Sequence, residues 1–185
     1  MTPVAVYIAE LDRIFRRGDA TEHSYRPALK TLLESYAVSI EATNEPQRIA
    51  GNAPDYVVRR GAAIIGHVEA KDIGEPLEKL LKSPQLKRYR EALPNLMFTD
   101  YLDVVWIENG EIKLRVSLGA QQGRGIVAAA DADARWKDLS MAFFNAVTPT
   151  VRTPKQLASL LAAQTRLLRD ATEWLGSGVE ESSSR

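Results

Sequence analysis

The sequence contains no cysteine, which excludes both disulfide bridges and metal sites built from thiolates. Histidine is almost absent too. His23 and His67 are the only two, and an isolated histidine is more often a packed or exposed imidazole than a metal ligand. No apolar run is long enough to span a membrane and no secretory signal is visible, so we expect a cytoplasmic protein.

An excess of one charge is also missing. The 24 Lys and Arg residues balance 24 Asp and Glu residues, so any surface that contacts phosphate must be a local patch. What is present is ordinary for a globular protein: 45% hydrophobic and 26% charged residues over 185 positions. We expect a single domain over residues 1–175 and a linker or flexible tail at 176–185.

The stretch 52–71 carries two short apolar runs that we predict to be adjacent β-strands. Asp55 immediately precedes the first run, at 56–58, and Glu69 follows the second, at 62–68. A tight connection between the two strands would bring the carboxylates of Asp55 and Glu69 to one place.

Two carboxylates at one place suit a hard divalent cation. Mg²⁺ takes oxygen ligands, usually including one or two protein carboxylates, and completes its coordination with waters and substrate phosphates. Asp55 and Glu69 would supply the two carboxylates, and Ala70 its backbone carbonyl oxygen. Residues 69 and 71 point to the same face of a strand, so the ammonium of Lys71 can orient a water or neutralise charge on a phosphate. The alternative interpretation of Glu69 and Lys71 is a solvated Glu–Lys pair at a strand end, which would have the same sequence.

The motif Pro54-Asp55 followed by Glu69-Ala70-Lys71 resembles the signature of PD-(D/E)XK nucleases, with Asp55, Glu69 and Lys71 at the three catalytic positions. Gln85 and Tyr89, four apart on a predicted helix, resemble the Q-x-x-x-Y element that follows this signature in restriction enzymes. In their order, these motifs and the segment NLMFTDY most resemble one nuclease domain. It is the N-terminal domain of restriction-modification enzymes with a fused adenine-specific DNA methyltransferase (type IIG or type ISP-like), over about residues 20–175.

The resemblance implies a restriction-endonuclease-like core and hydrolysis of phosphodiester bonds in double-stranded DNA with Mg²⁺, for which Mn²⁺ can substitute. It also implies a methyltransferase or specificity domain in the same polypeptide. In this family an acidic residue on an early helix can join the metal site, and Glu22 and Glu34 are both candidates. The alternatives are a favourable interaction with the helix dipole for Glu22 and a solvated helix face for Glu34.

The most basic stretch of the chain directly follows the predicted catalytic strand. It contains Lys79, Lys82, Lys87, Arg88 and Arg90. Such runs usually form a solvated helix face with acidic partners, but this position leads us to expect that Lys87 or Arg88 contacts DNA phosphate. Gln85 and Tyr89 would support the site, with an edge of the core and a helix cap as their alternative roles.

The complete pattern predicts an α/β fold: a small mixed β-sheet of about four strands with helices on both faces. Helices are expected at 2–18, from 21 or 24 to 36, at 76–93 with a break at Ser83-Pro84, at 131–146, and from Thr153 with Leu157, Leu160, Leu161, Leu167 and Leu168 as its apolar stripe. Strand-forming residues at 97–107 and 111–118 flank the turn Asn109-Gly110, and the alternation in 111–118 predicts an edge strand. We expect a loop or short strand at 41–53 and a flexible loop at 119–130.

Two other functions fit the same residues. One is a stand-alone DNA repair or junction nuclease, and the other is a non-catalytic DNA-binding module of the same fold. The intact set of Asp55, Glu69 and Lys71 favours an enzyme, because a module freed from catalysis need not retain all three residue types. The linker-like tail favours a domain of a larger enzyme over a stand-alone nuclease.

Overall fold

The structure is a computed structural model that describes residues 1–44, 54–146, 157–159, 161–166 and 169. Two amphipathic helices open the chain, as predicted: α1 (Pro3–Phe15) and α2 (Glu22–Glu34). The Thr2 hydroxyl accepts a hydrogen bond from Ala5 N at the start of α1, and Ser24 Oγ accepts one from Thr21 N at the start of α2. Apolar residues at spacings of three and four therefore face inward on both helices.

Six strands form one mixed sheet in the described part of the chain, in the order β1-β2-β3-β4-β5-β6. Their bounds are β1 (Ile40–Asn44), β2 (Tyr56–Arg60), β3 (Ala63–Ala70), β4 (Asn95–Thr99), β5 (Asp103–Glu108) and β6 (Glu111–Ser117). The pair β3 and β4 is parallel, and every other neighbouring pair is antiparallel. It follows that β3, β4 and β6 run in one direction and end at the same end of the sheet.

The crossover between the parallel strands β3 and β4 contains two short helices, α3 (Leu77–Leu80) and α4 (Pro84–Ala92). The predicted break at Ser83-Pro84 separates them. Ser83 Oγ accepts a hydrogen bond from Leu86 N at 3.2 Å, and Pro84 occupies the first turn, where its missing N–H costs no helical bond.

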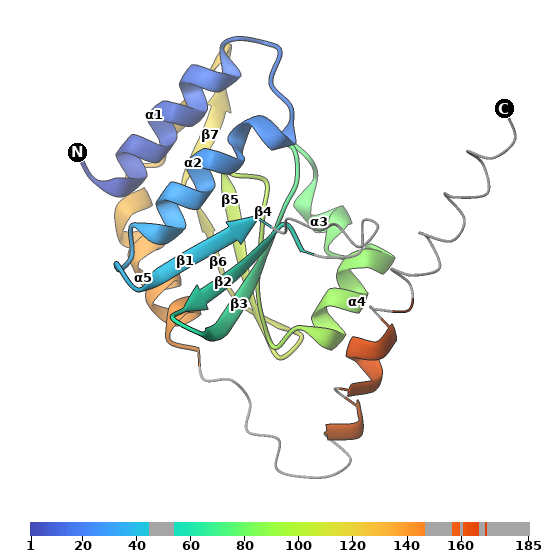
Figure 1. The fold of residues 1–185 in the computed structure, drawn as a ribbon. Helices are drawn as coiled ribbons and strands as arrows, with labels where there is room; N and C mark the ends of the chain where they lie inside the picture. Colours follow the sequence, from blue (N-terminus) through green and yellow to red (C-terminus); the bar gives the residue numbers. More distant parts are fainter. Residues whose placement is uncertain (45–53, 147–156, 160, 167–168, 170–185) are drawn as a thin grey trace, which may run out of the picture.

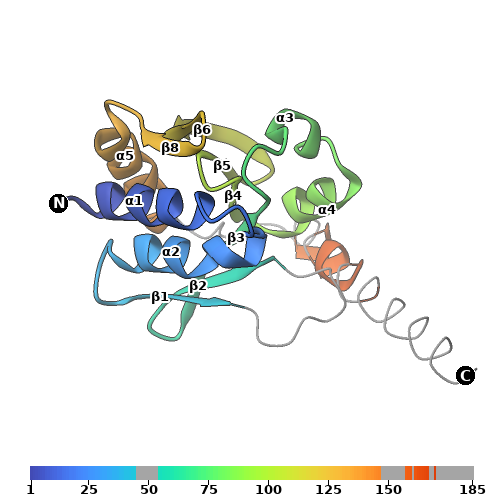
Figure 2. The same ribbon diagram turned by 90° about the horizontal axis from the view of Figure 1, so that it is seen from above.

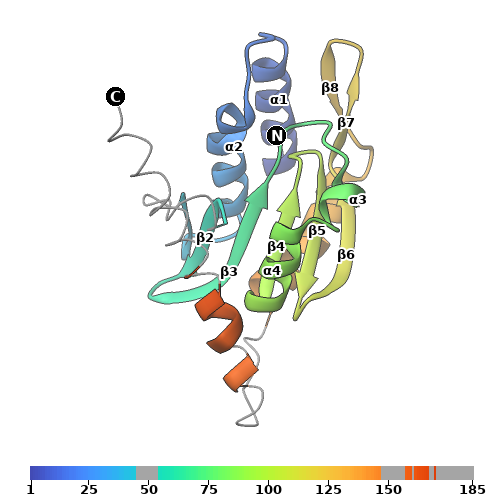
Figure 3. The same cartoon turned by 90° about the vertical axis from the view of Figure 1, so that its right-hand side faces the viewer.

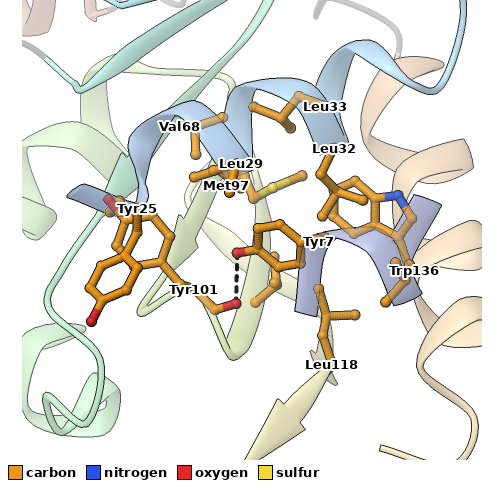
Figure 4. Close-up of a cluster of buried hydrophobic side chains, with 14 of the residues drawn as sticks. Tyr7, Tyr25, Leu29, Leu32, Leu33, Val68, Met97, Tyr101, Leu118 and Trp136 are labelled. Carbon is orange, nitrogen blue, oxygen red and sulfur yellow. Dashed lines mark hydrogen bonds between the residues drawn. The ribbon is translucent and has the colours of Figure 1, made fainter. Parts of the chain in front are cut away.

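Helices cover both faces of the sheet, as predicted (Figures 1 and 2). The helices α1, α2 and α5 (Ala132–Phe144) pack on one face around a large apolar cluster, and α3 and α4 pack on the other around a smaller one. Alternate residues of β4 divide between the two clusters: Met97 belongs to the first, and Leu96 and Phe98 to the second. Figure 4 shows part of the first cluster, in which the Tyr7 hydroxyl donates to the Tyr101 carbonyl at 2.8 Å.

The predicted number of strands is too low. The segment 97–107 contains two strands, because the Asp100 carboxylate accepts hydrogen bonds from Leu102 N and Asp103 N and so turns the chain between β4 and β5. Tyr101 within this turn has a φ of 72°. The sixth strand is β1, whose residues Ile40 and Ala42 are buried in alternation. At the other edge, β6 is the edge strand that its alternation predicted, reached through the turn at Asn109-Gly110.

The segment 119–130 is not a loop without regular structure. It forms a two-stranded hairpin, β7 (Gly119–Gln122) and β8 (Gly125–Ala128). Its residues are too small and polar to show an apolar period, and a contact distant in sequence holds it: Asp12 of α1 accepts a hydrogen bond from Ile126 N at 2.7 Å. A pattern search along the sequence therefore misses this element.

The expected apolar stripe after Thr153 is wrong where it can be checked. Leu157 and Leu161 are 45% and 51% exposed, while Ala163 is buried in the smaller cluster, so another face of this helical segment meets the domain. The residues Leu160, Leu167 and Leu168, the loop at 45–53 and the tail 176–185 lie outside the described residues. In the described part, no helix is both long and apolar enough to cross a membrane.

Candidate active site

The register of the sheet brings the first two predicted site residues together. Tyr56 of β2 pairs with Val68 of β3, so Asp55, which directly precedes β2, lies beside the last residues of β3. Asp55 Oδ2 accepts a hydrogen bond from Ala70 N at 2.9 Å. The Asp55 carboxylate is thus fixed against the backbone between Glu69 and Lys71.

Arg26 of α2 is a member of this site that the sequence analysis did not identify. Its Nη2 atom donates to Asp55 Oδ1 and, at 2.6 Å, to Glu22 Oε1. The side chains of Arg26 and Asp55 are 10% and 11% exposed, and that of Glu22 is 24% exposed. The Arg26 guanidinium therefore lies between the carboxylates of Glu22 and Asp55 and pairs with both, at a position with little access to water.

Two tyrosine hydroxyls hold the start of α2 at the end of the sheet. Tyr56 donates to the carbonyl oxygen of Arg26 and Tyr101 to that of Glu22, both at 2.8 Å. Thr99 Oγ1 in turn accepts a hydrogen bond from Tyr101 N at 2.8 Å, which stabilises the turn that carries Tyr101. The sequence signal for this arrangement is the four-residue spacing of Glu22 and Arg26 on one helix, which marks a local ion pair but not its contact with Asp55.

Glu69 is the most deeply buried acid of the site, with its side chain 4% exposed. Its Oε1 accepts hydrogen bonds from Lys71 Nζ at 2.6 Å and from Gln85 Nε2 at 3.3 Å. Its Oε2 is buried and has no hydrogen-bond partner in the described residues. Burial, together with the nearby Asp55 carboxylate, raises the pKa of Glu69 to about 7, although Lys71 acts in the opposite direction.

Lys71 is an ammonium group beside Glu69, as the strand period predicted. Burial lowers the pKa of Lys71, but the nearby carboxylates of Glu69, Glu22 and Asp55 together outweigh burial, and the net effect is a pKa above the ordinary value. The side chain is 24% exposed. Lys71 can therefore present a positive charge and a hydrogen-bond donor to a molecule that enters from solvent.

The structure also brings Gln85 and Tyr89 to the site. Gln85 Nε2 donates to the Tyr89 hydroxyl at 3.2 Å as well as to Glu69, so one amide joins α4 to the end of β3. Tyr89 is 1% exposed, and burial followed by the charge of Glu69 raises its pKa. The pair thus orients Glu69 from the face of the sheet opposite to α2.

The remaining predicted residues divide. Glu34 lies elsewhere: its Oε1 accepts from Lys30 Nζ and from Ala42 N, which ties the end of α2 to β1. Lys87 is exposed on α4 and Arg88 is half-buried, and the structure does not test their contact with DNA. Arg90 of the same basic stretch has a structural role, because its guanidinium donates twice to the carbonyl oxygen of Gly110.

The arrangement fits a divalent cation in part. In the described residues no group of three or more acidic or histidine side chains gathers as a metal site. Two carboxylates and one backbone carbonyl nonetheless lie close together, and Glu69 Oε2 has no hydrogen-bond partner among the described residues, so it could serve as an oxygen ligand. Asp55 is less available, because Arg26 and Ala70 N each occupy one of its oxygens.

One comparison with known proteins finds a solved structure that shares this fold. No family model matches the chain, and no curated protein matches it. Among solved structures, the chain is similar to part of a protein in a cryo-EM structure of a DrdV–DNA complex, with a TM-score of 0.62 and 24% sequence identity. The match covers 80% of this chain and 14% of that one. The chain therefore spans about one seventh of the protein it resembles.

Proposed function

We propose that this chain is a metal-dependent DNA endonuclease domain that hydrolyses phosphodiester bonds. The observation that carries the proposal is Glu69 Oε2, a buried carboxylate oxygen with no hydrogen-bond partner among the described residues, next to the Asp55 carboxylate and the Lys71 ammonium. A buried polar atom without a partner costs free energy, so such an atom is a reason to look for a ligand. An acid pair with a lysine at one strand end suits phosphoryl chemistry.

Each residue of the site has a separate role in this proposal. Asp55, Glu69 and the carbonyl of Ala70 would hold Mg²⁺ or Mn²⁺, which when bound supplies a Lewis acid for the phosphate oxygens. Lys71 would orient the attacking water or neutralise the phosphate, and Gln85 with Tyr89 would hold Glu69. Glu22 remains a predicted ligand, although Arg26 lies between it and Asp55.

Double-stranded DNA is the proposed substrate. The motif order and the similarity to part of a protein solved with DNA both support it. Because the similarity covers a small share of that protein, we propose that this domain is the cleavage module of a restriction-modification enzyme. A methyltransferase or specificity domain in the same polypeptide would deliver the DNA, which raises its effective concentration at a weakly binding nuclease. The exposed Lys87 and the half-buried Arg88 of α4 would add phosphate contacts.

Nicking of supercoiled plasmid tests the proposal. We expect nicking that requires Mg²⁺ and is lost with a chelator, with Asp55→Asn and with Glu69→Gln. Glu111→Gln is the matched control, because Glu111 is an exposed acid whose side chain is 75% accessible. It begins β6, at the end of the sheet opposite to the candidate site. Thermal melting of each variant separates loss of chemistry from loss of fold. Undiminished nicking by a folded Glu69→Gln variant would refute the assignment.

A non-catalytic DNA-binding module is the second candidate, and one observation favours it. Arg26 and Ala70 N already satisfy both oxygens of Asp55, so this acid is stable without a metal ion. A module of this kind would bind DNA in the plasmid assay without cutting it, whether or not Mg²⁺ is present.

A further inference from the structure

The hairpin β7–β8 projects past the sheet at the end where the candidate active site lies (Figure 3). The strand directions place it there. β3 and β4 are parallel, and β5 and β6 each reverse direction, so β6 ends at the same end of the sheet as β3, whose last residues are Glu69 and Ala70. The hairpin follows β6 directly, and Leu118 N donates to the Leu102 carbonyl in the turn after β4.

The hairpin is attached to the domain at Gly125 and Ile126, the residues that directly follow its turn. Asp12 Oδ1 accepts a hydrogen bond from Ile126 N at 2.7 Å, and Arg16 Nε holds the other oxygen of Asp12 at 2.7 Å. Ile126 is 5% exposed in the large cluster. A Cβ atom on Gly125 would lie 2.4 Å from Arg16 Nη2 and 2.7 Å from Asp12 Oδ1. The absence of a side chain at Gly125 therefore allows the hairpin backbone to approach α1 closely.

The tip of the hairpin, unlike Gly125 and Ile126, is open to solvent: all four residues from Gln121 to Arg124 are exposed. Gly123 has a φ of 59° and stands first in a two-residue turn, the position that a type II′ turn gives to glycine. Arg124 makes no hydrogen bond or ion pair with the described residues. The hairpin contains no acidic residue between Gly119 and Ala128.

From this placement we infer that the hairpin tip, Gln121 to Arg124, contacts duplex DNA beside the scissile phosphate. Arginine and glutamine are donors for phosphate oxygens, and both also pair with base edges. The major groove is about 12 Å wide and admits a two-stranded ribbon. An exposed cation on a rigid hairpin suits a polyanion that passes the end of β3. The inference rests on the proposed function, because it takes DNA as the substrate.

The test compares two variants that each lose one positive charge. Arg124→Gln removes the charge at the tip, and Lys113→Gln removes one from β6 nearer its opposite end, where Lys113 pairs with Glu111 at 2.7 Å. Affinity for a short labelled duplex is measured by fluorescence anisotropy over a salt series without Mg²⁺. One phosphate contact contributes about −0.9 to the slope of log K against log salt.

We expect the Arg124→Gln variant to show a slope shallower by about 0.9, and the Lys113→Gln variant to match the unmodified chain. Between about 50 and about 200 mM salt, the unmodified chain should lose about 3.5-fold more affinity than the Arg124→Gln variant. Equal slopes for the two variants, or no DNA binding by the unmodified chain at low salt, would overturn the inference.

Failure of the nuclease proposal has a different signature. If the unmodified chain binds DNA with the expected difference between the variants but never nicks plasmid with Mg²⁺, the hairpin contact stands and the catalytic assignment falls. If plasmid is nicked but both variants bind alike, the nuclease stands and the hairpin contact falls. Melting curves of both variants should overlay that of the unmodified chain, since neither side chain is buried.

Discussion

Replacing Arg26 with methionine tests whether one guanidinium holds the acid site together. Methionine keeps an unbranched apolar side chain of similar reach but removes the charge and every donor. Glu22 and Asp55 would then lose the cation they share. Asp55, with its side chain 11% exposed, would become a charged group with little access to water. We therefore expect the variant to fold but with a clearly lower free energy of unfolding.

The size of the loss follows from burial. Removing one partner of a buried ion pair costs about 3–5 kcal/mol. Asp55 would keep its hydrogen bond from Ala70 N, and the Glu22 side chain, 24% exposed, can gain hydration. Both effects favour the lower end, about 3 kcal/mol. In a domain of this size 1 kcal/mol shifts the melting temperature by about 2–4 °C, so the expected decrease is about 6–12 °C.

Arg13→Met is the matched control for this measurement. Arg13 forms a two-point contact with Glu10 on the same helical layer, but the two side chains are 61% and 39% exposed. Exposed pairs contribute about 0–1 kcal/mol, so the control should melt within a few degrees of the unmodified chain. Urea unfolding at pH 7 gives both free energies. Equal losses for the two variants would refute the reasoning, because burial would then make no difference.

Three further predictions concern the residues at the end of β3. The Lys71→Ala variant should lose nicking activity, while its Mn²⁺ affinity, measured by calorimetry, should remain largely unchanged. If its Mn²⁺ affinity falls as much as that of Glu69→Gln, Lys71 has a structural role instead. Because the pKa of Glu69 rises from 4.5 to about 7 on folding, the folded chain binds the extra proton, and metal-free stability should fall as pH rises through this window. The free energy of unfolding of the unmodified chain should decrease by about 3 kcal/mol, and that of Glu69→Gln should not show this decrease. The same pH profile of melting for the two proteins would contradict this prediction. Gln85→Ala should reduce nicking about 10–100-fold through loss of the Glu69 contact, whereas Tyr89→Phe, which keeps that contact, should reduce it less.

The local part of the site could be predicted from sequence because it depends on short-range geometry. The period of two in a strand puts Lys71 beside Glu69, and the four-residue spacing on a helix puts Gln85 beside Tyr89. The break before α4 follows from proline chemistry at Ser83-Pro84. Each of these expectations needs only neighbours within one element, and the structure agrees with all of them.

Contacts between distant elements could not be predicted in this way. Arg26 and Asp55 are 29 residues apart, and their pairing depends on tyrosines of β2 and of the turn after β4 that fix the position of α2. The hairpin β7–β8 has a turn signal in Gly123-Arg124, but its strands lack apolar alternation, and its attachment comes from Asp12. Sequence periodicity describes which face of an element is apolar, not which element it meets.

Under the proposed function, the charges of the site link metal binding to DNA binding. Three carboxylates and two cations meet at the end of β3: Glu22, Asp55, Glu69, Arg26 and Lys71. Above the pKa of Glu69 this set carries one net negative charge, which repels a phosphodiester. A divalent cation reverses that sign, so each ligand should tighten the binding of the other by the same factor. In a chain with no net charge, the end of β3 would then attract DNA only while the metal is bound, in addition to the contact inferred for the hairpin tip, which couples retention of the substrate to the capacity to cut it.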